Sequence, residues 1–331
     1  MTEEKSLYEQ LSDRIMTSGS KIIPELFAFI ANDDEARLML ATPGNVEELS
    51  EKTGKDVKTT KKMLDELFHK GLMFKSTKND VTKYRMCRDI VQFHDATILW
   101  PEAPKEYHTL WKKYMDTEWF SYAKVIEKVV KDPFTRVVPV GQSIEAESQV
   151  QTVDDVMRIL DNARRFAVTD CTCRTIDGKC GAPLEVCLQV DKSADYAIER
   201  GTGRELTRDE AREIIEKCDE EGLVHVIMNS ASKQHFICNC CRDCCQTMPV
   251  FIKEGVNILA PSRFAAQVNE IECTGCESCI ERCFFGAITM EEDGTALVDP
   301  DRCMGCGVCI PVCPVEAIVL IETRDVDTIP A

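Results

Sequence analysis

The feature that most constrains this 331-residue sequence is a cysteine spacing that occurs twice near its end. Each run reads C-x2-C-x2-C-x3-C, and the second begins thirty residues after the first. The runs are Cys273, Cys276, Cys279, Cys283 and Cys303, Cys306, Cys309, Cys313. Gly275 and Gly305 repeat with them, and Pro314 follows the second run. Because three thiolates two residues apart can surround one face of a cubane, the spacing predicts metal ligation.

The stretch from about residue 268 to residue 321 resembles the bacterial two-cluster ferredoxin domain. The resemblance implies two [4Fe–4S] clusters, each of which takes its fourth ligand from the other run. The implied ligand sets are Cys273, Cys276, Cys279 and Cys313 for one cluster, and Cys303, Cys306, Cys309 and Cys283 for the other. Phe284 departs from the pattern, because a proline usually follows the first run, but that proline is not a ligand. A pair of structural zinc sites is the alternative, which would give the regular third and fourth thiols no role.

Nine further cysteines lie in the middle of the chain. They are Cys171, Cys173, Cys180, Cys187, Cys238, Cys240, Cys241, Cys244 and Cys245. They could hold two more four-cysteine clusters with one thiol left over, or one cluster beside a redox-active or substrate-facing set. Two simpler alternatives are that these cysteines are reduced structural residues or that they bind zinc. The sequence leaves open which of the nine cysteines would bind the same cluster. We hypothesise at least one additional iron–sulfur cluster here.

The segments around these cysteines suggest how they are presented. The pattern predicts a strand over residues 166–168 that delivers Cys171 and Cys173 in an extended segment, with both thiols on one side. After Cys240 we expect a helix that brings together thiols at positions i, i+3 and i+4, which are those of Cys241, Cys244 and Cys245. The letters DCTCR and CNCCRDCC resemble poorly characterised multidomain iron–sulfur proteins of anaerobes, a resemblance that assigns no reaction.

The distribution of cysteine favours a reducing compartment. The polar, acidic beginning MTEEKSLYEQ does not resemble a signal peptide, so nineteen cysteines indicate metal ligation in a cytoplasm rather than disulfides. No apolar run approaches the ~20 residues of a membrane-spanning helix. Cys87 and Cys218 stand apart from the groups, and we interpret them as core residues.

Residues 24–88 read as helix, helix, turn, helix and hairpin, an order that resembles a winged helix-turn-helix domain. From Gly44 to Arg88 there are eleven basic against seven acidic residues, a net charge of +4 within a chain of −17. The candidate nucleic-acid contacts are Lys55, Lys58, Lys61 and Lys62. Asp56, Asp65 and Glu66 interrupt that surface, and this helix carries no arginine to read guanine. A protein-docking module or a solvated helix face is therefore favoured over DNA binding.

The segment between these regions is rich in aromatic residues. It holds all three tryptophans, Trp100, Trp111 and Trp119, at spacings that fit a helix. Aromatics at this spacing indicate a core or an interface rather than a cofactor site. GTGR at residues 201–204 is too short for a dinucleotide fingerprint, and the sequence contains no Walker motif, so it has no nucleotide-binding motif.

Together these patterns predict an α+β multidomain chain. The expected parts are a winged-helix-like domain at 1–90, an aromatic-rich helical connector at 91–150, a cysteine-rich α/β domain at 151–262, a two-cluster ferredoxin domain at 263–323 and a tail at 324–331.

The function that fits these parts is a relay of single electrons at low potential to or from an anaerobic oxidoreductase. The expected partner is a redox protein, for example a flavin-containing complex with a basic docking face that complements the net charge of −17. A component of an oxidoreductase system is favoured over a stand-alone enzyme. One alternative is a redox-sensing winged-helix regulator of transcription, and another is a reductase with its active site at the central cysteines.

Overall fold

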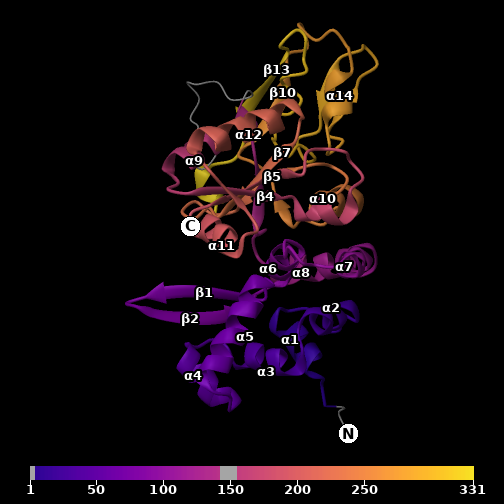
Figure 1. The fold of residues 1–331 in the computed structure, drawn as a ribbon. Coiled ribbons are helices and arrows are strands. Elements are labelled where there is room, and N and C mark those ends of the chain that lie inside the picture. Colours follow the sequence, from indigo (N-terminus) through magenta and orange to yellow (C-terminus); the bar gives the residue numbers. More distant parts are fainter. Residues whose placement is uncertain (1–3, 142–154) are drawn as a thin grey trace. The chain divides into compact units, whose positions relative to one another are not determined.

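The computed structural model describes residues 4–141 and 155–331, which form two compact units. The first unit is Met1–Tyr122 with Glu199–Thr202, and the second is Ala123–Ile198 with Gly203–Ala331. Figure 1 labels their helices and strands, and the mixed content agrees with the expected α+β class. The boundary after Tyr122 falls inside the expected connector, and the five-part division of the chain stays a prediction.

The first unit is mainly helical. Its elements are α1 (Leu7–Arg14), α2 (Ile22–Ile30), α3 (Asp33–Ala41), α4 (Val46–Thr53), α5 (Val57–His69), β1 (Met73–Lys78), β2 (Val81–Met86), α6 (Ile90–Ile98) and α7 (Lys105–Thr117), and α8 (Trp119–Val129) begins at its end. Asn45 and Glu48 form a reciprocal capping box that begins α4, and left-handed Gly54 ends it. Four helices, α2 to α5, precede the hairpin, one more than the three expected for residues 24–88, and the identification of this region as a winged helix stays a prediction.

The hairpin of β1 and β2 is closed by a two-residue turn. Asn79 and Asp80 both have positive φ values, 50° and 61°, as a type I′ turn requires. Lys78 pairs with Val81, so the two strands continue up to these two turn residues. This turn type matches the twist of the two strands and so fixes their register.

Aromatic side chains form the core of the first unit. Phe27 of α2 stacks on Phe93 of α6, with ring centroids 4.1 Å apart. Trp111 of α7 packs against Phe93 at 5.1 Å and edge-on against Tyr114 at 5.8 Å. Trp111 and Tyr107 are fully buried. These contacts confirm that the aromatic helix contributes to a core.

A sheet of seven strands organises the second unit. In sheet order its strands are β6 (Arg204–Leu206), β4 (Phe166–Asp170), β5 (Glu185–Val190), β8 (Phe236–Cys240), β7 (Val224–Met228), β3 (Thr135–Val138) and β9 (Leu259–Ala260). Neighbours pair antiparallel except β3 with β9, which are parallel. Strand β3 comes from the expected connector, so this segment completes the sheet that carries the central cysteines.

The two faces of the sheet pack against different layers. Two helices, α9 (Val156–Asn162) and α12 (Arg208–Glu220), cover one face with an apolar core that includes Leu160, Ile215 and Leu188. On the other face, Val137 and Val226 belong to a core shared with α13 (Met248–Glu254) and with residues of the C-terminal cysteine region. The remaining helices of this unit are α10 (Thr172–Asp177) and α11 (Lys192–Arg200).

The C-terminal cysteine region contains two short antiparallel pairs. Strand β10 (Phe264–Val268) pairs with β13 (Ile318–Glu322), and β11 (Ile288–Met290) pairs with β12 (Ala296–Val298). A short helix, α14 (Ser278–Arg282), contains the third cysteine of the first run, Cys279, and the 3-10 turn η3 (Val326–Thr328) lies near the C-terminus. Among the described residues, no helix combines the length and the apolar character that crossing a membrane requires.

Candidate metal centres

The backbone around the two C-terminal cysteine runs repeats with the thirty-residue period of the sequence. Gly275 and Gly305 both adopt a left-handed conformation, with φ values of 66° and 63°. Two residues later, Glu277 and Gly307 repeat a second left-handed position, at 63° and 74°. Left-handed residues between cysteines curl the chain, so that successive thiols can face a common centre.

Backbone amides point at the cysteine sulfurs of this region. The Ala287 N–H donates to Cys283 Sγ at 3.3 Å, and the Ala317 N–H donates to Cys313 Sγ at 3.3 Å in the second copy. The Ala266 N–H likewise donates to Cys303 Sγ at 3.4 Å. Amide donors of this kind stabilise negative charge on thiolate sulfur, and they are among the contacts that set the potential of a bound cluster.

The first implied ligand set lines one cavity. Its walls include the thiols of Cys273, Cys276 and Cys279 from the first run and Cys313 from the second. Gly275, Met290 and Ala296 complete part of the lining. A cysteine of the second run therefore lines the same cavity as three cysteines of the first, and its role as the fourth ligand stays a prediction.

The second implied set is more deeply buried. Cys303, Cys306 and Cys309 are all buried, and Cys283 is partly exposed. Burial, together with the smaller effect of the nearby sulfurs of Cys283 and Cys303, raises the pKa of Cys306 to about 12. Without a metal these buried thiols stay protonated, and a bound metal would stabilise their deprotonated form. The sulfur donors and the amide donors fit iron–sulfur clusters at both sets, and the cavity adds to this fit at the first set.

We expect Gly305→Ala to remove iron from the second set, because a Cβ there would lie 2.0 Å from the Phe264 carbonyl oxygen. The matched control is Gly255→Ala, since Gly255 has a similar φ of +65° and no atom within 4 Å of its Cβ position. The control should cost only the strain of a left-handed alanine, about 1–2 kcal/mol. Iron and acid-labile sulfide per chain measure the difference. Equal contents in the two variants would show that the close approach at Gly305 is not required.

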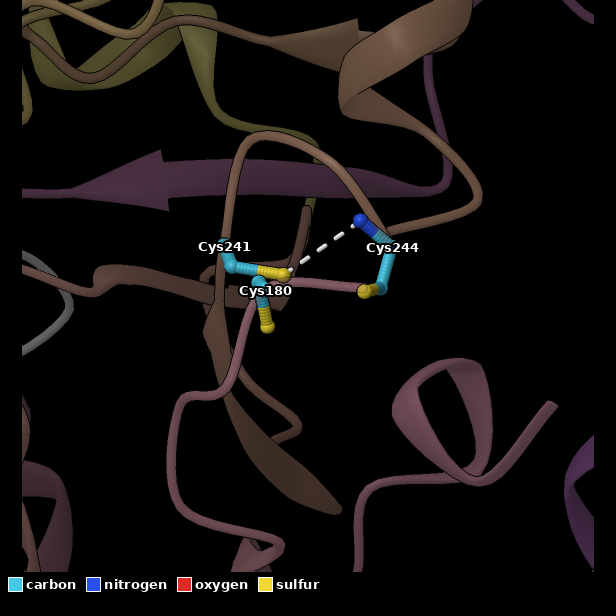
Figure 2. Close-up of side chains that lie close together, drawn as sticks. All are labelled: Cys180, Cys241 and Cys244. Atoms are coloured by element: carbon cyan, nitrogen blue, oxygen red, sulfur yellow. Dashed lines mark hydrogen bonds between the residues drawn. The ribbon is translucent and has the colours of Figure 1, made fainter. Parts of the chain in front are cut away.

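Three of the central cysteines form a compact group, the thiol triad of Cys180, Cys241 and Cys244. Figure 2 shows their side chains gathered from two separate loops. Their Sγ atoms all lie within 4.8 Å of one another, so the three thiols could bind one metal ion. The Cys244 N–H donates to Cys241 Sγ at 3.4 Å, as the dashed line in Figure 2 marks.

The other six central cysteines follow one another in a chain of thiol contacts. In order they are Cys173, Cys171, Cys187, Cys238, Cys240 and Cys245. Hydrogen bonds from Cys173 and Cys187 hold the pKa of Cys171 well below its ordinary value. The pKa of Cys187 is raised for the complementary reason, since it lies between the sulfurs of Cys171 and Cys238 and is buried. We call this set the thiol chain.

The structure corrects two expectations about how the central cysteines are presented. Residues 241–245 form a turn, and the next helix, α13, begins only at Met248, so no helix gathers Cys241, Cys244 and Cys245. Cys245 instead contacts Cys240 in the thiol chain. Cys171 caps the N-terminus of α10 and Cys173 lies within that helix, so the two are not in an extended segment.

Sequence reasoning missed a buried arginine between the two thiol groups. Arg174 is 4 % exposed, and its Nη atoms donate to the carbonyl oxygens of Pro183 and Asn239, each at 2.6 Å. Its side chain also hydrogen-bonds to Cys241, and Cys171 lies near enough to add a favourable charge interaction. Burial lowers the pKa of Arg174, but the neighbouring thiolates outweigh that effect and the pKa ends above its ordinary value. The signal in the sequence was its position directly after Cys173.

A buried polar network was missed as well. His225 Nε2 lies 2.6 Å from Asp219 Oδ1, and His225 Nδ1 lies 2.6 Å from Asn239 Oδ1. The side-chain amide of Asn239 donates to the Val186 carbonyl at 2.6 Å, while the backbone carbonyl oxygen of Asn239 accepts from Arg174. This network joins α12 to the strands that lead into the cysteine loops.

The candidate nucleic-acid lysines lie on or beside α5, and three of them are paired with acids. Lys55 Nζ lies 2.7 Å from Asp34, Lys62 lies 3.5 Å from Glu66, and Lys61 pairs with Asp65. Lys58, Lys61 and Lys62 line an open surface pocket together with Trp100. The pairings reduce the positive charge that this face presents.

The two isolated cysteines are core residues, as interpreted from the sequence. Both Cys87 and Cys218 are 1 % exposed. Burial raises the pKa of Cys218 to about 12, and burial raises the pKa of Cys87 beyond its ordinary range. Cys218 belongs to the same apolar cluster as Cys241 and Cys244 but is not a member of the thiol triad.

Comparison with known proteins identifies one region of the chain. The family model of the 4Fe-4S dicluster domain matches residues 266–320, close to the stretch expected from the cysteine spacing. No match was found among curated proteins or among solved structures. The matched domain and the cysteine groups define an iron–sulfur redox protein.

Proposed function

We propose that this chain is an electron-transfer protein of the ferredoxin type, with two [4Fe–4S] clusters on the two implied ligand sets. The observation that carries the proposal is the cavity lined by Cys273, Cys276, Cys279 and Cys313, which joins cysteines from both runs. When bound, such a cluster accepts and returns one electron at a time. The chain contributes amide donors to Cys283, Cys303 and Cys313 and an apolar surrounding that excludes water.

A shared core supports a route from these clusters toward the central cysteines. Cys306 and Cys283 belong to the same apolar core as Cys238, Cys240 and Cys245 of the thiol chain. Phe285, which is 1 % exposed, lies in this core, and the Val140 N–H donates to the Cys306 carbonyl at 3.0 Å. We therefore propose that the thiol chain holds at least one further iron–sulfur cluster, so that electrons pass between it and the second ferredoxin-type cluster.

Anaerobic purification followed by EPR during stepwise reduction tests this proposal. Two cubanes need about eight iron atoms per chain, and we expect the protein to contain more than that. The EPR signals of the clusters should appear in separate reduction steps. The reduced protein should pass electrons to an artificial acceptor without consuming a substrate. An iron content of about eight would remove the further cluster, and the absence of acid-labile sulfide would remove the whole proposal.

The net charge of −17 supports a redox partner with a basic docking face, such as a flavin-containing oxidoreductase in an anaerobic cytoplasm. We expect the rate of reduction by such a partner to fall as salt is added, because screening weakens long-range attraction between opposite charges. A rate that is independent of ionic strength would contradict docking by charge.

We also propose that residues 24–88 form a winged-helix module that docks protein rather than DNA. The order of α4, α5 and the β1–β2 hairpin supports the module, and the pairing of Lys55, Lys61 and Lys62 with acids argues against a phosphate-binding face. A gel-shift assay at low salt should show no retardation of duplex DNA. Salt-sensitive binding that changes with the oxidation state would favour the redox-sensing regulator instead.

A further inference from the structure

We infer that Cys180, Cys241 and Cys244 bind a single thiophilic divalent metal ion, separate from any iron–sulfur cluster. The inference does not depend on the proposed electron transfer, because it concerns a different set of sulfurs. Zinc and ferrous iron share the required chemistry, since both accept thiolate ligands in tetrahedral sites.

The local sequence shapes both loops of the site. Cys180 lies between Gly178 and Gly181, whose φ values of 62° and 67° are left-handed. These glycines turn the chain after α10, so that Cys180 faces the second loop. Cys241 and Cys244 are separated by two residues, the spacing that structural zinc sites commonly use. The hydrogen bond from the Cys244 N–H to Cys241 Sγ stabilises negative charge on that sulfur.

The spacing of the sulfurs distinguishes one ion from a cubane. With metal–sulfur bonds of about 2.3 Å and tetrahedral angles, two thiolates on one ion lie about 3.8 Å apart. In a cubane each cysteine binds a different iron atom, which places the sulfurs farther apart. All three Sγ atoms of the thiol triad lie within 4.8 Å of one another, so they fit a single ion.

Arg174 prepares the site as a positioning residue. It holds the Pro183 carbonyl, three residues after Cys180, and the Asn239 carbonyl, two residues before Cys241, and so it ties the two loops together. Its charge balances the net −1 of three thiolates on a divalent ion. The buried Arg174 Nε has no hydrogen-bond partner among the described residues, which leaves one donor for a group bound beside the sulfurs.

The fourth position of the ion is open to a ligand from outside the chain. Among the described residues, the group contains three sulfurs and no fourth ligand atom. Cys180 is partly exposed, whereas Cys241 and Cys244 are buried, so an external ligand can approach from the side of Cys180. Three protein ligands with an open position are the arrangement of reactive rather than purely structural zinc sites.

Elemental analysis of anaerobically purified full-length variants tests the inference. Cys180→Ala should lose one metal ion per chain and leave acid-labile sulfide unchanged. The matched control is Cys218→Ala, because Cys218 belongs to the same apolar cluster but lies outside the thiol triad, and it should keep the full metal content. Loss of several iron atoms together with sulfide from Cys180→Ala, or no loss of metal at all, would overturn the inference.

A second variant separates ligation from folding. Cys180→His replaces sulfur by an imidazole nitrogen, which also binds zinc and ferrous iron, at about 2.0–2.1 Å in the case of zinc. It should retain the single ion that Cys180→Ala loses. If Cys180→His loses sulfide as well as metal, the sulfurs belong to a cluster and the single-ion site is wrong.

Discussion

Removal of iron is expected to unfold residues 264–322 while the first unit stays folded. The core of the C-terminal region consists largely of small residues and cysteines, such as Ala265, Ala287, Cys279 and Cys309. Alanine side chains bury little apolar surface, so this core contributes little hydrophobic free energy. Metal–sulfur bonds must therefore supply much of the folding free energy, as in other small domains whose ligands are scattered along the chain.

Hydrogen exchange with mass spectrometry measures this effect. After the clusters are oxidised and the iron is chelated, the backbone amides of β10 and β13 should lose their protection. The internal control is tryptophan fluorescence, because Trp100, Trp111 and Trp119 all lie in the first unit. Their emission should stay unchanged. Full protection of β10 in iron-free protein would contradict the dependence of this region on metal.

The C-terminal site was predictable because its geometry is local. The spacing from Cys273 to Cys283 and its repeat indicate the ligands without knowledge of distant contacts. Gly275 and Gly305 appear in the sequence at the positions where the structure has left-handed backbone. What could not be predicted is the surrounding core, since strand β3 and Val140, which meets Cys306, come from a segment more than one hundred residues earlier.

The central site shows where sequence patterns become ambiguous. Cysteines at positions i, i+3 and i+4 fit a helix, but they also fit a turn in which two of them meet and the third turns away. Pro249 carried the missing signal, because proline is favoured in the first turn of a helix, and α13 does begin at Met248. The separation of Cys245 from Cys241 and Cys244 follows from that later start.

The burial and pairing of charged residues were the features of the structure that the sequence predicted least. Only its position directly after Cys173 marks Arg174 in the sequence, and that position does not predict burial, since arginine is mostly exposed unless it has partners. The same holds for Asp219, which lies on a helix with an acidic, exposed face. Lys55 and Lys62 gave the opposite error, because a count of basic residues does not reveal which of them are paired with acids.

Asp219→Ala is expected to lower the free energy of unfolding of the central sheet by about 3–5 kcal/mol, the usual cost of breaking a buried ion pair. Asn239 presents its carbonyl oxygen to His225, because its amide group donates to Val186. The Asp219 carboxylate also accepts, from the Gly141 N–H at 3.2 Å and from His225. Both ring nitrogens of His225 face acceptor oxygens, so we expect His225 to donate from each of them and to be the cationic partner of Asp219.

The matched control is Glu102→Ala in the first unit. His69 and Glu102 lie 2.8 Å apart, almost as close as His225 and Asp219, but their side chains are 46 % and 61 % exposed against 0 % and 3 % for the buried pair. An exposed pair contributes less than about 1 kcal/mol, because water screens it. Hydrogen exchange of the β7 and β8 amides reports the first variant, and exchange of the α5 amides reports the control.

Asp219→Asn distinguishes the charge from the hydrogen bond. The asparagine carbonyl oxygen can still accept from His225 Nε2, but it leaves the imidazolium without a counter-charge. The loss of unfolding free energy in Asp219→Asn should therefore fall between the losses in Asp219→Ala and in the exposed control, Glu102→Ala. If Asp219→Ala costs no more than Glu102→Ala, then His225 is neutral in the folded protein and the buried charge pair is wrong. A large cost would instead mean that the strands leading into Cys187 and Cys240 depend on this charge, because Asn239 and Val186 connect His225 directly to them.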